Sequence, residues 1–121
     1  MAVRAAYAGK LNTFPVFMRV KDRTVVIVGG GEEALAKARL VAQCDTAIRI
    51  VADAPVPALA AFAAEQGAEL LRAPYEAAQI DGAVLVFAAT GEEAQDARVV
   101  ADARARNIPA NAVDRPQLCD F

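Results

Sequence analysis

The hydrophobic residues of this chain are concentrated in short runs that alternate with segments of helical spacing. Residues 24–28 form a continuous β-branched run without polar alternation, which is typical of a central parallel strand covered on both faces. Residues 83–88 form a second unbroken apolar run and predict another buried strand. Shorter strands are predicted at residues 47–52, 69–72 and 108–113.

Three further segments have the spacing expected of helices that pack on a sheet. In the first, the apolar side of the helical wheel consists of Ala34, Leu35, Ala38, Val41 and Ala42. Residues 57–66 are alanine-rich and precede Gly67, a favoured C-terminal cap. A third helix is predicted from Glu92 to about Arg106, and its expected buried face consists of Ala94, Ala97, Ala101 and Ala105. Residues 74–82 predict a loop or a single turn.

The alternation of strands and helices predicts the fold class. Short crossovers between successive strands require parallel strands and right-handed connections. We therefore expect an α/β domain of the Rossmann-like, doubly wound type, with a five-stranded parallel sheet in three layers. The 121 residues have the length of one ordinary domain. We expect residues 1–14 to form an N-terminal extension and residues 15–121 to form the domain.

A glycine-rich turn lies between the first strand and the first helix. Gly29, Gly31 and Ala34 fit the pattern G-x-G-x-x-A. In this pattern the first glycine makes the tight turn, the second lets the backbone approach a pyrophosphate, and the third small residue permits close packing of helix and strand. The position of the motif between a strand and a helix predicts dinucleotide binding. The alternative is a glycine turn that serves packing alone.

The remaining residues of the turn are expected to contact phosphate through the backbone. Gly30, Glu32 and Glu33 bring N–H groups to the start of the helix, where the helix dipole is positive. The alternative for the two glutamates is that their carboxylates only interact favourably with this dipole.

An acidic residue about twenty positions after the glycines is expected to bind the adenosine ribose. Asp53 lies at this place, at the end of the second predicted strand. It predicts NAD as the cofactor, because the additional phosphate of NADP would meet a like charge, unless Arg49 points into the site. The alternative is that Asp53 starts a turn before Pro55.

Ligands of open α/β sheets lie over the carboxyl ends of the strands, so residues just after the other strands are further candidates. Thr90 follows the fourth strand and is expected either to contact the cofactor or to cap the next helix. Asn111 and Asp114 flank the end of the last strand. The alternative for Asp114 is again the start of a turn.

Composition and charge disfavour several classes of function. Thirteen basic and fifteen acidic residues give a net charge of −2, without the basic excess typical of nucleic-acid binding, so we expect no nucleic-acid partner. No run approaches the roughly 20 apolar residues of a membrane span, and the N-terminus lacks the apolar stretch of a secretory signal. We therefore expect no membrane partner and a cytoplasmic location.

The reactive side chains are few. Cys44 and Cys119 lie far apart without companions, which excludes a zinc knuckle, a CxxC pair or a disulfide framework. The chain contains no histidine, which removes the commonest metal ligand and the commonest general base. We expect no metal ligands in the protein, and acid–base chemistry falls to carboxylates, lysine or tyrosine.

Several segments together resemble the N-terminal module of sirohaem synthase, the family of precorrin-2 dehydrogenases and sirohydrochlorin ferrochelatases. The resemblance covers about residues 14–121. It rests on Phe14-Pro15-Val16-Phe17, residues 25–31, Lys37-Ala38-Arg39-Leu40, Ala88-Ala89-Thr90 and Asn111-Ala112-Val113-Asp114.

This resemblance implies NAD-dependent oxidation of precorrin-2 to sirohydrochlorin, followed in many members by insertion of ferrous iron as a substrate to give sirohaem. It implies that Asp114 is the catalytic carboxylate, since both steps must remove protons. Asn111 is then expected to contact the tetrapyrrole substrate. Family members continue into a segment that forms a homodimer and completes the cleft, so we expect this chain to be cut before that segment and to be poorly active alone. A competing interpretation is a non-enzymatic NAD-sensing domain of a transporter or channel.

Overall fold

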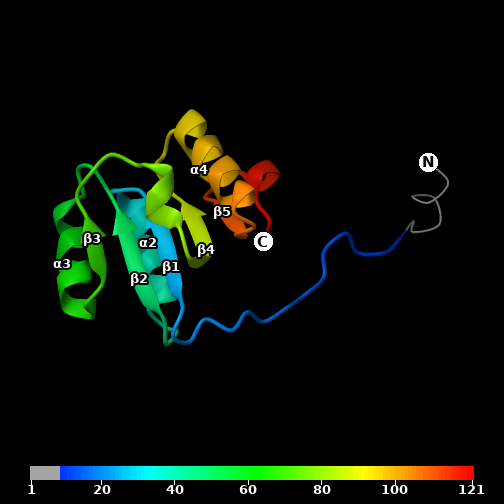
Figure 1. The fold of residues 1–121 in the computed structure, drawn as a ribbon, viewed down its shortest axis with the longest axis horizontal. Helices are drawn as coiled ribbons and strands as arrows, with labels where there is room; N and C mark the ends of the chain where they lie inside the picture. The colour runs from blue at the N-terminus through cyan, green and yellow to red at the C-terminus, as the bar shows by residue number, and fades with distance from the viewer. Residues whose placement is uncertain (1–8) are drawn as a thin grey trace.

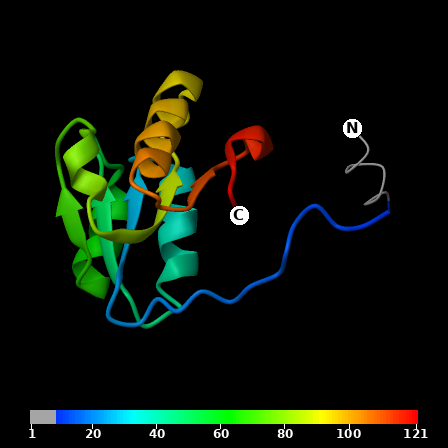
Figure 2. The ribbon, with the colours of Figure 1, turned by 45° about the vertical axis from the view of Figure 1, so that its right-hand side comes forward.

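The computed structural model describes residues 9–121, so residues 1–8 of the predicted extension lie outside the described residues. Between residues 9 and 23 the described chain forms no helix or strand. This segment runs away from the folded part, as Figure 1 and Figure 2 both show, and its apolar side chains at Leu11, Phe14 and Phe17 are exposed. The division of the chain after residue 14 stays a prediction.

A five-stranded sheet forms the centre of the fold, and all its neighbouring strands are parallel. The strand order is β3-β2-β1-β4-β5. The strands are β1 (Thr24–Val28), β2 (Ala47–Val51), β3 (Glu69–Leu71), β4 (Ala83–Ala88) and β5 (Ala110–Ala112). The predicted number, order along the chain and direction of the strands are confirmed, although β5 is shorter than predicted.

Helices cover both faces of this sheet and produce the predicted three layers (Figure 1). The helical elements are α2 (Glu32–Val41), α3 (Pro57–Gln66), α4 (Glu93–Ala105) and the short 3₁₀ helices η1 (Ala77–Ile80) and η2 (Pro116–Leu118). Helices α2 and α3 share a hydrophobic cluster with one face of the sheet, and α4 and η1 share a cluster with the other. Gly67 ends α3 in the left-handed conformation, as its cap position requires.

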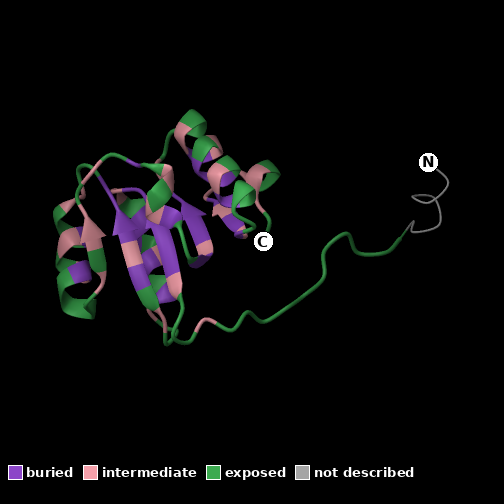
Figure 3. Ribbon diagram, in the orientation of Figure 1, coloured by how far each residue is buried: buried purple, intermediate pink, exposed green. Residues whose placement is uncertain are grey.

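The central strand β1 explains why its sequence lacks polar alternation. Val25 and Ile27 belong to the cluster beneath α2 and α3, while Val26 and Val28 belong to the cluster beneath α4. Figure 3 shows this continuous burial along the middle of the sheet, with exposed residues on the outer sides of the helices. A strand covered on both faces needs apolar side chains at every position.

The predicted buried face of α4 is wrong. Its buried residues are Asp96, Val99, Val100 and Ala103, whereas the expected Ala94, Ala101 and Ala105 are exposed and Ala97 is half-buried. Two stripes on this helix have helical spacing, and the sheet buries the one with valines because their side chains remove more apolar area from water than alanine methyls do. The stripe that is buried therefore carries a carboxyl group into the protein.

The glycine turn offers a direct test of the packing. Gly29 has φ 148°, and a Cβ placed on it would lie 2.0 Å from the carbonyl oxygen of Ala89, whereas a Cβ on Gly31 would meet nothing within 4 Å. We expect Gly29→Ala to lower the free energy of unfolding by about 3 kcal/mol or more. Gly31→Ala should change it by less than about 1 kcal/mol. Urea denaturation of both variants measures the difference, and equal stability of the two would contradict this packing.

Candidate functional site

The candidate site lies at the carboxyl ends of the strands, where the strand order reverses between β1 and β4. In parallel sheets such a reversal leaves a crevice, because the connections of the two neighbouring strands leave toward opposite faces. The glycine turn follows β1, Thr90 lies just after β4, and Asp114 lies just after β5. The fold therefore brings the three predicted segments to one edge of the sheet.

Two of the three glycines are explained by contacts within the protein. Gly29 packs so closely against the carbonyl of Ala89 that no side chain fits. A Cβ on Gly30 would lie 3.0 Å from the carbonyl oxygen of Ala54, and the Gly30 carbonyl accepts a hydrogen bond from Val56. The turn is thus held between the segments that follow β4 and β2.

Gly31 has no such explanation within the protein. Its backbone angles, φ −104° and ψ −161°, are open to any residue, and the position of its missing Cβ faces open space. It is the N-cap of α2, and no side chain caps this helix. The first amide groups of the helix therefore have no partner among residues 9–121 and point toward the same space. Such a helix start fits the phosphates of a dinucleotide.

The two glutamates of the turn, Glu32 and Glu33, are exposed in the first turn of α2. Neither side chain forms an ion pair with the residues described. Their backbone amides belong to the uncapped helix start, so the predicted contact with phosphate through the backbone is compatible with the geometry. The alternative, in which their carboxylates only interact with the helix dipole, is equally compatible with this geometry.

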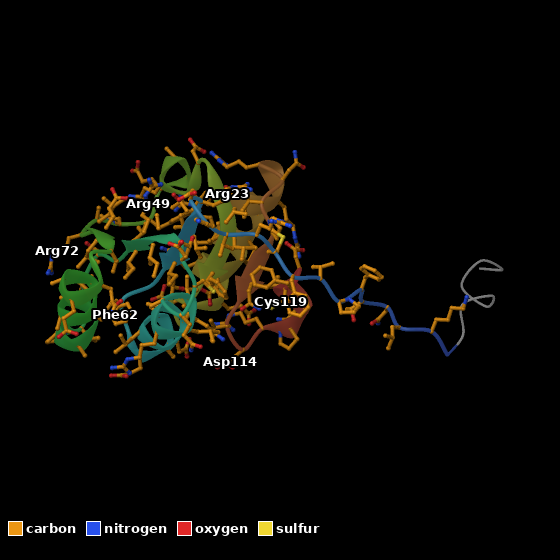
Figure 4. All side chains as sticks on the ribbon, turned by 90° about the horizontal axis from the view of Figure 1, so that it is seen from below. Arg23, Arg49, Phe62, Arg72, Asp114 and Cys119 are labelled. Atoms are coloured by element: carbon orange, nitrogen blue, oxygen red, sulfur yellow. The ribbon has the colours of Figure 1, made fainter. Side chains whose placement is uncertain are left out.

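Asp53 is exposed just beyond the end of β2, within a bend of the chain. Arg49 does not reach it, because the guanidinium of Arg49 forms an ion pair of 2.6 Å with Glu69 and donates to the carbonyl of Gln79. Arg72 follows the neighbouring strand β3 and is also exposed. In Figure 4, Arg49 and Arg72 point to different parts of the surface. Neither arginine forms an ion pair with Asp53 among the described residues.

Thr90 is bound to the protein through its own polar groups. Its amide and hydroxyl both donate to Asp96 Oδ1, at 3.0 and 2.6 Å, and its hydroxyl accepts from the amide of Glu92. The N-cap position of α4 belongs to Glu92 and not to Thr90. A contact between Thr90 and a cofactor would therefore use its carbonyl oxygen or its methyl group.

Asp114 has a left-handed backbone, with φ 61°. It lies inside the turn that follows β5, which is closed by a hydrogen bond from the Arg115 amide to the carbonyl of Ala112. Beside it is a hollow of about 500 Å³, whose lining includes Lys37, Asn111, Asp114, Arg115 and Cys119. Figure 4 shows Asp114 and Cys119 together on one side of the molecule and Arg23 on the opposite side.

The chain after η2 lies along the outer edge of β5. Asn111 Nδ2 donates to the carbonyl of Phe121 at 2.7 Å, and Asp120 exchanges hydrogen bonds with Ala110 through its amide and its Oδ2. Partial burial opposes ionisation of Asp120, but the amide of Ala110 and the guanidinium of Arg104 outweigh it and hold the pKa of this carboxyl below its ordinary value. Asn111 keeps its amide oxygen for a ligand.

Two residues of the site, Asp96 and Lys37, were not identified from the sequence. Asp96 is 1% exposed and bridges the loops that carry Thr90 and Asp114, because its Oδ2 accepts from Arg115 Nε at 3.0 Å. The sequence feature that could have identified Asp96 is the presence of an aspartate on the apolar stripe of α4. Lys37 lines the hollow without an ion pair among the residues described. Its sequence position placed it on the polar side of α2.

The described residues were also considered as metal ligands and as membrane-spanning helices. Within residues 9–121, no group of three or more His, Cys, Asp or Glu side chains could hold a metal ion. No helix of that part of the chain is long and apolar enough to cross a membrane.

Comparison with known proteins identifies named proteins with similar sequences. The chain is 42% identical over 111 residues to "Siroheme synthase" of Methylobacillus flagellatus, covering 92% of this chain and 24% of that protein. It is 45% identical over 109 residues to "Siroheme synthase" of Pseudomonas putida strain W619, covering 90% of this chain and 24% of that protein. The chain therefore spans about a quarter of the length of these relatives.

Solved structures show the same fold. A structure described as "SirC, precorrin-2 dehydrogenase" matches with a TM-score of 0.65 and 23% identity, covering 72% of this chain and 44% of that chain. An imine reductase from Pseudomonas sp. matches with a TM-score of 0.50 and 20% identity, covering 67% of this chain and 27% of that chain. Both similarities concern the architecture, and they confirm the predicted Rossmann-like class.

The chain also matches a protein-family model. The model described as "Putative NAD(P)-binding" matches residues 16–121. This match includes the glycine turn, the whole sheet and the loop of Asp114. The chain belongs to this NAD(P)-binding family.

Proposed function

We propose that the chain is the dinucleotide-binding part of an enzyme that oxidises precorrin-2 to sirohydrochlorin with NAD. The observation that carries this proposal is the carboxylate of Asp114, which lines a hollow at the same sheet edge as the uncapped start of α2. The names of the relatives support the choice of reaction. In this proposal a longer protein supplies the rest of the substrate cleft.

The residues at the sheet edge have separate tasks in this reaction. When bound, NAD would supply the nicotinamide that accepts a hydride from the tetrapyrrole. The proton that the substrate loses would go to a base. The amides that begin α2 hold the pyrophosphate, and Asp53 accepts hydrogen bonds from the ribose hydroxyls. The Asp114 carboxylate accepts the proton. A carboxylate in a turn beyond β5 can reach a flat macrocycle in the adjacent hollow without touching the nucleotide.

The hollow beside Asp114 also fits the charge of the substrate. Precorrin-2 is a polycarboxylated tetrapyrrole, so its binding requires cations and hydrogen-bond donors at the edge of the macrocycle. Lys37, Arg115 and Asn111, which belongs to β5, all line the hollow. In this proposal, Lys37 and the second N–H of Asn111 Nδ2 bind substrate carboxylates.

The same site accounts for a second step, the insertion of ferrous iron. The incoming metal is a substrate that the four pyrrole nitrogens bind, and their N–H protons leave to a base. Asp114 accepts these protons in the proposal, so one carboxylate serves both steps. We further propose that the complete enzyme is a homodimer.

Nucleotide binding can be separated from stability at Gly31. A methyl group at this position enters the open space above the helix start, where the pyrophosphate is expected. We expect Gly31→Ala to weaken NAD binding at least about tenfold, which corresponds to about 1.4 kcal/mol. Isothermal titration calorimetry with this chain measures the affinity. Unchanged affinity in the folded variant would contradict nucleotide binding at the turn.

The proposed choice of NAD over NADP depends on Asp53. We expect Asp53→Asn to weaken NAD binding about 10- to 100-fold, because a hydrogen bond to a charged group contributes about 1.5–3 kcal/mol. The affinity for NADP should fall less or rise, since a like charge beside the additional phosphate is removed. Calorimetric titrations with both nucleotides measure this change. Asp45→Asn, at an exposed aspartate before β2, is the control and should alter neither affinity.

The proposed catalytic role is tested by Asp114→Asn. Asparagine tolerates the left-handed conformation and has the same shape, so the variant removes the charge and preserves the turn. We expect precorrin-2 oxidation to fall about a thousandfold, with NAD affinity within about twofold, since a positioned base contributes about 10²- to 10⁴-fold. Absorbance of sirohydrochlorin formed by the longest natural form of the protein measures the rate.

Asp22→Asn is the matched control for this experiment. Asp22 is also an aspartate with a left-handed backbone, φ 60°, but it lies in the turn before β1 at the opposite end of the strand. Its substitution should leave the rate unchanged. Full activity of Asp114→Asn would contradict the role of Asp114 as the base of this oxidation.

A further inference from the structure

A single buried carboxyl group connects the loop after β4 to the loop after β5. Asp96 is 1% exposed, and its two oxygens have different partners. Oδ1 accepts from the amide and hydroxyl of Thr90, at 3.0 and 2.6 Å, and Oδ2 accepts from Arg115 Nε at 3.0 Å. Because a buried carboxyl requires partners on both oxygens, the two loops cannot move apart without leaving this group unsatisfied.

The loop after β5 needs such a constraint. Asp114 has φ 61°, a conformation that costs free energy in any residue except glycine and persists only where the surroundings enforce it. Its neighbour Arg115 closes the turn through its amide, which donates to the carbonyl of Ala112 at 3.1 Å. The side chain of Arg115 extends to Asp96 on α4. The turn is therefore fixed on both sides of Asp114, by the sheet and by the helix.

Asp96 is the principal partner of Arg115. The second carboxylate, Glu93, lies 3.4 Å from Arg115 Nη1 and is 76% exposed on its side chain, so water competes for it. The ion pair with Asp96 is shielded from water on the carboxylate side. Removing one member of a shielded pair leaves an uncompensated charge, whereas loss of the Glu93 contact leaves both groups solvated.

The other end of the same network reaches the glycine turn. Thr90, which Asp96 holds, follows Ala89, whose carbonyl packs against Gly29 and whose amide donates to Val28 at 2.7 Å. A displacement of Thr90 would therefore be transmitted to the wall of the nucleotide crevice. Asp96 lies between the two parts of the site that must be held at a fixed separation for a hydride and a proton to leave one substrate.

We propose that Asp96 is a positioning residue that, through Arg115, holds Asp114 in its left-handed conformation and, through Thr90, holds the loop that supports the glycine turn. Asp96 touches neither nucleotide nor substrate in this role. The expected effect of Asp96 on turnover rests on the proposed function of Asp114. The expected effect on the backbone conformation of Asp114 does not depend on that function.

The test uses Asp96→Asn and Arg115→Gln. An asparagine at position 96 can still accept from Thr90 through its amide oxygen, but its NH₂ group faces Arg115 and cannot accept, so one link is kept and the other is broken. In ¹H–¹⁵N NMR spectra of this chain, we expect the Asp114 amide resonance to shift or broaden in both variants. In the longest natural form of the protein, kcat for precorrin-2 oxidation should fall about 10- to 100-fold, with KM for NAD within about twofold.

Further variants separate positioning from general stability. The double variant Asp96→Asn/Arg115→Gln should have the same kcat as the slower single variant, since both remove one link. Arg115→Lys should restore part of the activity. Arg106→Gln breaks an ion pair of 2.6 Å with Asp81 near the other end of α4 and should change neither the Asp114 resonance nor kcat.

The outcomes distinguish this inference from the proposed function. An unchanged Asp114 resonance in Arg115→Gln overturns the positioning role, whatever the reaction is. An additive loss of kcat in the double variant overturns it as well. If Asp114→Asn retains full turnover, the proposed catalytic role of Asp114 fails, and the NMR result alone decides whether Asp96 positions the loop.

Discussion

The close approach between Gly29 and the carbonyl of Ala89 is the constraint on which the rest of the structure depends. It is possible only because β1 and β4 run side by side with their carboxyl ends level, and because position 29 has no side chain. The Gly29 amide donates to Val51 of β2, while the Ala89 amide donates to Val28 of β1. These bonds fix the turn between both neighbouring strands. The start of α2 is thereby directed into the crevice and not onto the sheet.

This arrangement separates two kinds of recognition. The backbone supplies the binding groups for phosphate, and such groups depend on the conformation of the turn more than on the identity of its side chains. The side chains with chemistry line a hollow near β5, where Lys37 of α2 and Asn111 of β5 lie close to Asp114 in the turn after β5. A substitution in one part therefore need not alter the intrinsic affinity of the other, provided that the loops between them keep their positions.

The fold and half of the site could be predicted from the sequence. Unbroken apolar runs at residues 24–28 and 83–88 identified the buried strands, because burial on both faces leaves no polar positions. The glycine motif was readable because backbone geometry restricts residue type over a few consecutive positions. The role of Asp96 was not readable. An acidic residue in the first turn of a helix also suits the helix dipole, and the partner that distinguishes the two roles, Arg115, lies nineteen residues away.

The outer edge of β5 determines whether another strand can pair with this side of the sheet. The edge amide and carbonyl of Ala110 are occupied by Asp120, and the carbonyl of Ala112 accepts from Cys119 Sγ, so an added strand must first displace these groups. The lowered pKa of Asp120 means that its contribution to stability is present above the pKa of the unfolded chain and is lost as pH falls through the folded value. Acid therefore removes the charge through which Asp120 binds Arg104 and the Ala110 amide most strongly, and so weakens the segment that covers this edge.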